Sequence, residues 1–161
     1  MTNKERALMV AEKAHNNQPY DIYPYMYHIR QVVKIAEELG YDESIVVASA
    51  LHDTLEDTPL SYNDIKKAFG KEVAEIVYCV TDELGRDRNE KKEKTYPKIR
   101  ANWKATVVKI CDRIANVSQS KDYNKGLYEM YKKEHEIFCS RLMSKEHPHE
   151  VVRLDAKTLG F

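Results

Sequence analysis

The stretch IVVASALHDTLEDT, residues 45–58, joins an apolar run to one histidine and three acidic residues. The part up to Leu51 is apolar on nearly every side of a helix, which predicts a central, buried helix. Asp42 can cap this helix, which we expect to run to about Leu55 before Pro59 ends it. The segment therefore predicts a helix that begins in the core of the protein and ends in ionisable side chains.

The ionisable residues at the end of this stretch have helical spacing. His52 and Glu56 lie four residues apart, and so do Asp53 and Asp57. On one continuous helix they form two adjacent rows about 100° apart, so all four can face one cleft. Burying several carboxylates is costly without positive charge, and few Lys or Arg lie nearby in sequence. A divalent cation would compensate the charge of these carboxylates. A His-Asp dipeptide alone, however, more often lies on an ordinary polar surface.

Length and composition predict one domain with a sizeable core, since 161 residues suffice to bury most apolar side chains. Lys plus Arg and Asp plus Glu number 26 each, so no overall field attracts nucleic acid or an anionic membrane. The three cysteines form no CxxC pair, which indicates reduced thiols in a cytoplasmic protein. No signal peptide or membrane-spanning run is evident. We expect a domain at 1–143 and a C-terminal tail or extension at 144–161.

The rest of the chain also has helical periodicity, without a strand pattern, a repeat or an interdomain linker. The fold class predicted from it is therefore all-α. The further helices are expected around Leu8–Ala14, around Val32–Leu39 before Gly40, from a Ser61/Asp64 capping box to Phe69, around Val73–Val80, and at about 103–118 and 124–143.

Two segments are less regular. The charge run RDRNEKKEK, residues 86–94, is most simply a solvated loop or helix face. Its alternative role is a mobile element that contacts phosphate. Beyond Ser144, His147 and His149 could bind a metal weakly, but a solvent-exposed tail is the simpler interpretation.

Two distant segments supply the other residues that a cation would need. PYMYH ends in His28 at the start of a helix, and VKICDRIAN places Asp112 on an apolar helix. With His52 and Asp53 they offer two imidazoles and two carboxylates. This set suits a borderline ion such as Mn, Fe, Co or Zn better than Ca or Mg.

Lys109 and Asn116 lie three residues before and four residues after Asp112, so they face the same cleft. A cation and an amide beside a metal suit an anionic substrate that carries hydroxyl groups. His15 is equally consistent with a hydrogen-bonded core residue and with a site residue, and His135 has no evident acidic partner, so we expect one metal and not two.

The remaining candidates are weaker. Cys111 precedes Asp112 and points about 100° away from the cleft, which indicates a core thiol. The tyrosines at positions 20, 23, 25 and 27 could stack on a base, although clustered tyrosines more often pack a surface loop.

The order of these motifs resembles the HD-domain metal phosphohydrolases and, within them, the RelA/SpoT-type alarmone hydrolase domain. Between Ala14 and Val117 the matching segments are AHNNQ, PYMYH, ASALHDTLEDT, FGKEVAEIVYCVTDE and VKICDRIAN. The pair ALHDTLEDT and VKICDRIAN at this separation is the most specific. The resemblance implies a compact HD-domain helical bundle that acts as a stand-alone hydrolase, since no synthetase or regulatory domain follows.

The resemblance also implies a role for each site residue. It implies a metal, with manganese as the expected ion, held by His28, His52, Asp53 and Asp112. Glu56 and Asp57 would orient the attacking water and accept its proton. Asn116 would hold the ribose, and Lys109 and Arg113 would neutralise phosphate charge.

The implied substrate is (p)ppGpp, cleaved at its 3′ pyrophosphate, but the chain departs from the family pattern. A basic pair usually lies between the AHxxQ and PYxxH motifs, whereas residues 19–23 read PYDIY, with one residue fewer and no Lys or Arg. Ile29 replaces a proline that commonly follows the first ligand histidine. One alternative is therefore hydrolysis of another nucleotide, and a second is an idle module that binds nucleotide or protein. The intact Glu56 and Asp57 argue against the second, and the sequence does not determine the oligomeric state.

Overall fold

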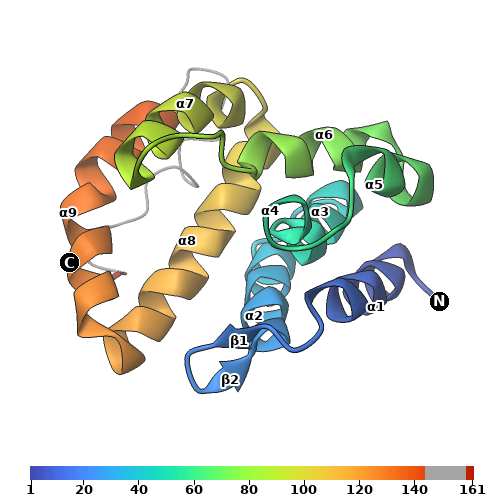
Figure 1. The fold of residues 1–161 in the computed structure, drawn as a ribbon, viewed down its shortest axis with the longest axis horizontal. Coiled ribbons are helices and arrows are strands. Elements are labelled where there is room, and N and C mark those ends of the chain that lie inside the picture. Colours follow the sequence, from blue (N-terminus) through green and yellow to red (C-terminus); the bar gives the residue numbers. More distant parts are fainter. Residues whose placement is uncertain (144–158) are drawn as a thin grey trace.

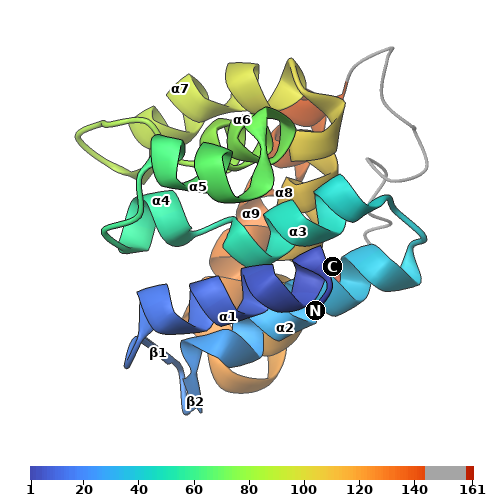
Figure 2. The same ribbon diagram turned by 90° about the vertical axis from the view of Figure 1, so that its right-hand side faces the viewer.

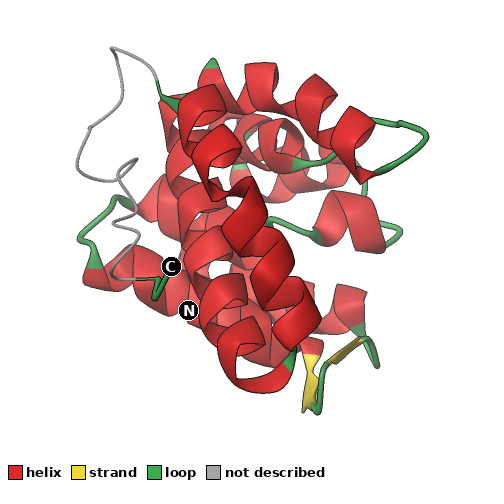
Figure 3. Cartoon of the chain, turned by 90° about the vertical axis from the view of Figure 1, so that its left-hand side faces the viewer, coloured by secondary structure: helices red, strands yellow, loops and turns green. Residues whose placement is uncertain are grey.

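The computed structural model describes residues 1–143 and 159–161, most of them helical (Figures 1, 2 and 3). The all-α fold class is therefore confirmed. The domain boundary at residue 143 stays a prediction, and His147 and His149 lie outside the described residues. The elements are α1 (Asn3–His15), β1 (Pro19–Tyr20), β2 (Tyr23–Pro24), α2 (Tyr25–Glu38), α3 (Glu43–Leu51), α4 (Thr54–Asp57), α5 (Tyr62–Phe69), α6 (Lys71–Val80), α7 (Arg88–Arg100), α8 (Trp103–Tyr123) and α9 (Lys125–Leu142).

Helix α8 lies between two groups of helices (Figure 1). Helices α2, α3 and α6 contact it on one side, and α7 and α9 on the other. The sequence predicts its start at 103 correctly but ends it too early, because the polar residues after 118 lack the apolar spacing of the first part. No helix in the described ranges combines the length and apolar character that crossing a bilayer requires.

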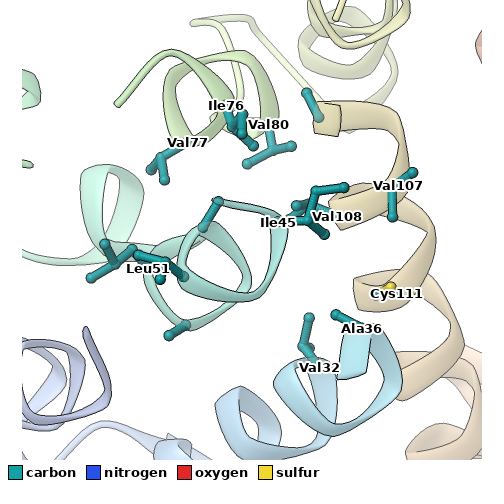
Figure 4. Packing of buried hydrophobic residues seen from close by; sticks show 14 of the residues in the cluster. Val32, Ala36, Ile45, Leu51, Ile76, Val77, Val80, Val107, Val108 and Cys111 are labelled. Atoms are coloured by element: carbon teal, nitrogen blue, oxygen red, sulfur yellow. The ribbon is translucent and has the colours of Figure 1, made fainter. Parts of the chain in front are cut away.

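Helix α3 lies at the centre of the core, as its uniformly apolar sequence predicts. Every residue from Ile45 to Leu51 is buried. Figure 4 shows Ile45 among residues of α2, α6 and α8, including Val77 and Val108. Apolar side chains on all sides of α3 are therefore removed from water when the chain folds, and the hydrophobic effect fixes the position of this helix.

The two helix caps that the sequence predicts are also confirmed. The Asp42 side chain accepts the backbone N–H of Ile45, and Ser61 and Asp64 form a capping box at the start of α5. These bonds satisfy backbone N–H groups that have no partner within the helix. Gly70, at φ 93°, separates α5 from α6 in a conformation that favours glycine.

The prediction of one continuous helix through Leu55 is wrong. Helix α3 ends at Leu51, and the four-residue helix α4 begins at Thr54. The Thr54 hydroxyl donates to the Leu51 carbonyl at 2.7 Å, so a side chain satisfies a group near the end of α3. His52 and Asp53 therefore lie in a turn between two helices and not in the helical rows that the sequence predicts.

The structure also contains one hairpin that the sequence does not predict, and it makes most of the charge run part of a helix. Strands β1 and β2 pair antiparallel, Tyr20 opposite Tyr23, with Asp21 at φ 51° in the turn. Two residues per strand are too few to give a detectable alternation. The charge run 86–94 continues into α7, whose buried residues are confined to its C-terminal half. Ion pairs on this helix, such as Lys94 with Glu90, agree with a solvated helix face.

We expect Leu51→Ala to lower the free energy of unfolding by about 2–5 kcal/mol, because the residue is fully buried and its removal leaves a cavity. Leu84→Ala is the matched control, since Leu84 is 88% exposed and should change stability by less than about 0.5 kcal/mol. Urea unfolding of both variants checks this. Equal small effects would show that α3 is not the centre of the core.

Candidate metal centre

Four side chains with metal-binding atoms converge from three parts of the fold. His28 lies near the start of α2, His52 and Asp53 in the turn after α3, and Asp112 in the middle of α8. One donor atom from each lies within 4.8 Å of the donors of the others. It is the one group of this kind in residues 1–143 and 159–161. The structure therefore brings together the four residues that the sequence predicts as ligands, and metal binding by them stays a prediction.

Both imidazoles point the same nitrogen at the carboxylates. Asp112 Oδ1 lies 3.0 Å from His28 Nε2 and 3.3 Å from His52 Nε2. Asp53 Oδ2 lies 2.9 Å from His52 Nε2, and the two Nε2 atoms are 3.4 Å apart. The four donor atoms thus lie close together, as the ligands of one shared ion would.

Two further bonds orient these ligands. His52 Nδ1 donates to the Ser49 carbonyl oxygen at 2.8 Å, which leaves Nε2 facing the cluster. The Tyr25 hydroxyl donates to Asp53 Oδ2. Hydrogen bonds of this kind fix the tautomer and direction of metal ligands. The sequence gives a signal for Tyr25 only, as one of several tyrosines, and none for the carbonyl of Ser49.

Electrostatic attraction in the cluster outweighs the cost of burial. Burial alone would raise the pKa of Asp53 and Asp112, yet neighbouring positive groups lower both, chiefly His52 for Asp53 and Lys109 for Asp112. Burial alone would lower the pKa of His52, and the two carboxylates raise it well above its ordinary value. A metal ion that binds here must displace the proton of His52, so a rise in pH favours binding.

The donor set fits a divalent metal on physical grounds. The His28, His52 and Asp112 side chains are buried, and Asp53 is about four fifths buried. Two carboxylates buried this close together require positive charge nearby. Imidazoles that bind a metal are neutral, so the metal ion itself would have to supply that charge. Neutral imidazole nitrogen with carboxylate oxygen is a mixture that first-row transition ions accept.

Lys109 and Asn116 both contact the carboxylate of Asp112, as their spacing in the sequence predicts. Lys109 Nζ lies 3.0 Å from Asp112 Oδ2, and Asn116 Nδ2 donates to Oδ1 at 2.9 Å. The Tyr20 hydroxyl donates to Asn116 Oδ1 at 2.7 Å and so connects the hairpin to α8. Burial opposes the charge of Lys109, but Asp112 holds its pKa above the ordinary value. The lysine stays protonated beside the cluster.

The two acids of α4 lie at the exposed edge of the cluster. Glu56 accepts the backbone N–H of Asp82, and Asp57 Oδ2 accepts from Gln18 Nε2 at 3.2 Å. Neighbouring protein removes part of the water around both carboxyl groups, and this partial burial raises the pKa of each. The sequence predicts the two acids but neither partner, because Gln18 and Asp82 come from other parts of the chain.

Arg113 is the one predicted site residue that the structure does not bring to the cluster. Its guanidinium is buried, lies 4.1 Å from the Phe138 ring centroid and donates to Glu134 Oε1 at 3.2 Å. One residue along a helix turns the side chain by about 100°, so Arg113 points from Asp112 toward α9. Its contacts hold α8 and α9 together. Cys111, on the other side of Asp112, is a buried core thiol as predicted, and burial raises its pKa to about 12.

The comparisons with known proteins agree with this geometry. A family model described as an HD domain matches residues 7–138. The chain belongs to the HD-domain family. A divalent metal held by histidines and aspartates is in keeping with that family and with the cluster.

Curated relatives of this HD-domain chain include enzymes of guanosine tetraphosphate metabolism. It is 34% identical over 119 residues to a guanosine-3′,5′-bis(diphosphate) 3′-pyrophosphohydrolase of Aquifex aeolicus, which covers 70% of this chain and 17% of that protein. The bifunctional (p)ppGpp synthase/hydrolase SpoT of Escherichia coli gives 34% over 120 residues, with the same coverage. The Drosophila melanogaster pyrophosphohydrolase MESH1 gives 32% over 97 residues, 58% of this chain and 54% of that protein. The chain thus spans less than two thirds of each relative.

Solved structures share the fold. A metazoan ortholog of SpoT, described as hydrolysing ppGpp, superposes with a TM-score of 0.78 at 24% identity, over 96% of this chain and 93% of that one. A Listeria monocytogenes protein superposes with a TM-score of 0.69 at 27% identity, over 85% and 96%. The helical arrangement of this chain is therefore shared with these two solved proteins.

We expect Asp112→Ala to lose stoichiometric metal, because the carboxylate lies between both imidazoles. Asp122→Ala is the control, since Asp122 is an exposed acid on the same helix, outside the cluster, and should keep the metal. Elemental analysis and metal titration of both variants measure the difference. Thermal unfolding checks that the first variant is folded, and unchanged metal content in it would remove Asp112 from the ligand set.

Proposed function

We propose that the chain is a metal-dependent phosphohydrolase that removes the 3′ pyrophosphate of (p)ppGpp. The observation that carries this proposal is the joint presence of the four-residue cluster and, one turn away, of the two acids of α4. The names of the Aquifex and Drosophila relatives support the substrate.

Manganese is the ion we propose, held by His28, His52, Asp53 and Asp112. An ion of this kind supplies Lewis-acid polarisation of a phosphoryl oxygen and lowers the pKa of water. Asp112 and His52 would bring their donor atoms to it with little rearrangement, because Lys109, Asn116 and Ser49 already hold them.

Glu56 and Asp57 are the groups that would orient the attacking water and accept its proton. Both carboxyl groups have raised pKa values through loss of hydration, which makes each a stronger base than a free carboxylate. The N–H of Asp82 restrains Glu56, and Gln18 restrains Asp57. Restrained acids lose little entropy when they align with the water.

Positive charge for the phosphates would come from α8 and from the charge run. Lys109 stays protonated, and Lys92 of α7 is a mostly buried cation that pairs with Asp82 at 2.8 Å. Burial and the nearby Lys109 lower the pKa of Lys92 to about 8. A bound phosphate would offset the repulsion between the two lysines, which favours the phosphate-contacting interpretation for this part of the run.

The nucleoside would bind on the hairpin side of the cluster. A cavity of about 180 Å³ opens there between α2 and α8, and its lining includes Tyr20, Tyr27, His28 and Gln119. Aromatic walls suit a base, and Asn116, at 2.7 Å from the Tyr20 hydroxyl, is positioned for the ribose. The substrate would thus lie across the metal ligands, with the base toward α2 and the phosphates toward α7.

We expect Glu56→Gln to reduce turnover below about a tenth of the wild-type rate, a barrier increase of more than about 1.4 kcal/mol, while metal stays bound. The amide keeps the size of the side chain but cannot accept the proton of water. Release of pyrophosphate from ppGpp with Mn present gives the rate, and elemental analysis gives the metal.

Glu83→Gln is the control, because Glu83 lies near Asp82 in the chain and pairs with Lys98 away from the cluster. It should keep the wild-type rate. A Glu56→Gln variant that retained most of its activity would exclude Glu56 as the proton acceptor. No hydrolysis of any nucleotide by the wild-type protein with Mn would instead favour a module that only binds.

The hairpin generates a prediction on affinity. Its tip, Asp21 and Ile22, carries no cation, and a charge-assisted contact contributes about 1.5–3 kcal/mol. We therefore expect a high KM for ppGpp, and expect Asp21→Lys with Ile22→Arg to lower it. These positions leave Tyr20 free to keep its bond to Asn116.

Steady-state kinetics over a range of ppGpp concentrations measure this KM. The pair Asp21→Asn with Ile22→Gln serves as the uncharged control and should leave KM close to that of the wild-type protein. Tight, guanine-selective hydrolysis by the unmodified chain would show that other cations, such as Lys92, already provide the contact.

A further inference from the structure

Gln18 connects a buried histidine to one of the two acids of α4. It lies between α1 and β1, outside every helix and strand. Its side-chain Nε2 lies 3.2 Å from Asp57 Oδ2, and its Oε1 lies 2.9 Å from His15 Nδ1. Asp57 is 39 residues away in the chain, so the fold and not the local sequence brings the two together.

The chemistry of these contacts determines which atom donates. An ionised carboxylate only accepts hydrogen bonds, so the amide must present its NH₂ group to Asp57. Its carbonyl oxygen then faces His15, and only a proton on His15 Nδ1 can complete that bond. Rotation of the Gln18 amide group by 180° would break its hydrogen bonds to both Asp57 and His15.

The surroundings of His15 determine which of its ring nitrogens carries the hydrogen. Its side chain is 4% exposed, and its ring lies 4.6 Å from that of Tyr25, between centroids. The other ring nitrogen, Nε2, is buried and has no hydrogen-bond partner in the described part of the chain. A proton there would be a buried donor without an acceptor, which is costly, so Nδ1 is the nitrogen that carries the hydrogen.

The backbone of Gln18 is fixed as well. Its N–H donates to the His15 carbonyl oxygen, and its own carbonyl oxygen accepts the N–H of Tyr25, each at 2.9 Å. Gln18 therefore joins the end of α1 to the start of α2 through its main chain. A side chain on so restrained a backbone has little freedom to move away from Asp57.

We propose that Gln18 is a positioning residue that holds the carboxyl group of Asp57 for its action on water, and that His15 sets the orientation of the Gln18 amide. This inference rests on the proposed hydrolysis for its kinetic test. In the described part of the chain, neither Gln18 nor His15 bonds to a predicted metal ligand. Tyr25, whose ring lies beside that of His15, donates to Asp53.

A double-mutant cycle tests the proposal. Gln18→Leu keeps the size of the side chain and removes the donor, so kcat should fall about tenfold or more, with KM and metal content nearly unchanged. In an Asp57→Ala background the same change should cost nothing further, because its target is gone. Asn17→Ala, at an exposed position in the same loop, is the control and should keep the wild-type rate. Unchanged kcat in Gln18→Leu, or equal losses in both backgrounds, would overturn the proposal.

His15 is tested by a conservative replacement. His15→Asn places an amide N–H near the position of Nδ1 and should retain most of the activity, whereas His15→Phe fills the same space without a donor and should behave like Gln18→Leu. Thermal unfolding of both variants reports on packing. Equal activity of the two at equal stability would show that His15 only fills the core.

A readout without turnover separates this inference from the proposed function. Long-range ¹H–¹⁵N spectra of the metal-free protein should show the hydrogen of His15 on Nδ1, and Gln18→Leu should alter that signal. A wild-type protein without hydrolase activity but with this tautomer would contradict the proposed function and leave the bond chain standing. A hydrogen on Nε2 would disprove the bond chain whatever the activity.

Discussion

The side chain of Asp112 is the point on which the centre depends. This buried carboxylate, in the middle of α8, contacts His28, His52, Lys109 and Asn116. A negative charge at such depth is stable only if its partners are complete, and those partners come from α2, from the turn after α3 and from α8 itself. The helices must therefore pack in one relative arrangement before the charge is satisfied. Packing of the core and assembly of the centre are one event.

Helix α3 connects the core to the centre physically. Its apolar residues are buried on all sides, and it ends where the ligands His52 and Asp53 begin. Because a close-packed core resists small displacements, the ligands inherit the rigidity of the helix that precedes them. The short helix α4 is different, since its acids are exposed and held by single hydrogen bonds from Gln18 and Asp82. A rigid metal cluster thus adjoins an acid pair whose orientation depends on neighbouring loops.

The sequence predicts what depends on local chemistry and periodicity. Apolar spacing identifies the buried α3, and the Ser61/Asp64 capping box gives the start of α5. The family motifs identify four residues that the structure places close together. The break after α3 escapes prediction because a hydroxyl, that of Thr54, competes with continuation of the helix. The bond from Tyr20 to Asn116 escapes it because 96 residues separate the partners, and only the packing of the hairpin against α8 brings them together.

The origin of the four cluster residues in separate helices has a consequence for the lifetime of the protein. An ion held by α2, α8 and the turn after α3 would bind the folded chain and not the unfolded one, so each tenfold excess of free metal over its dissociation constant would add about 1.4 kcal/mol to stability. Removal of the metal by a chelator would lower the stability of the folded chain as well as stop the proposed reaction. The abundance of such a protein in a cell would then follow the supply of metal, since proteolysis acts on the unfolded fraction.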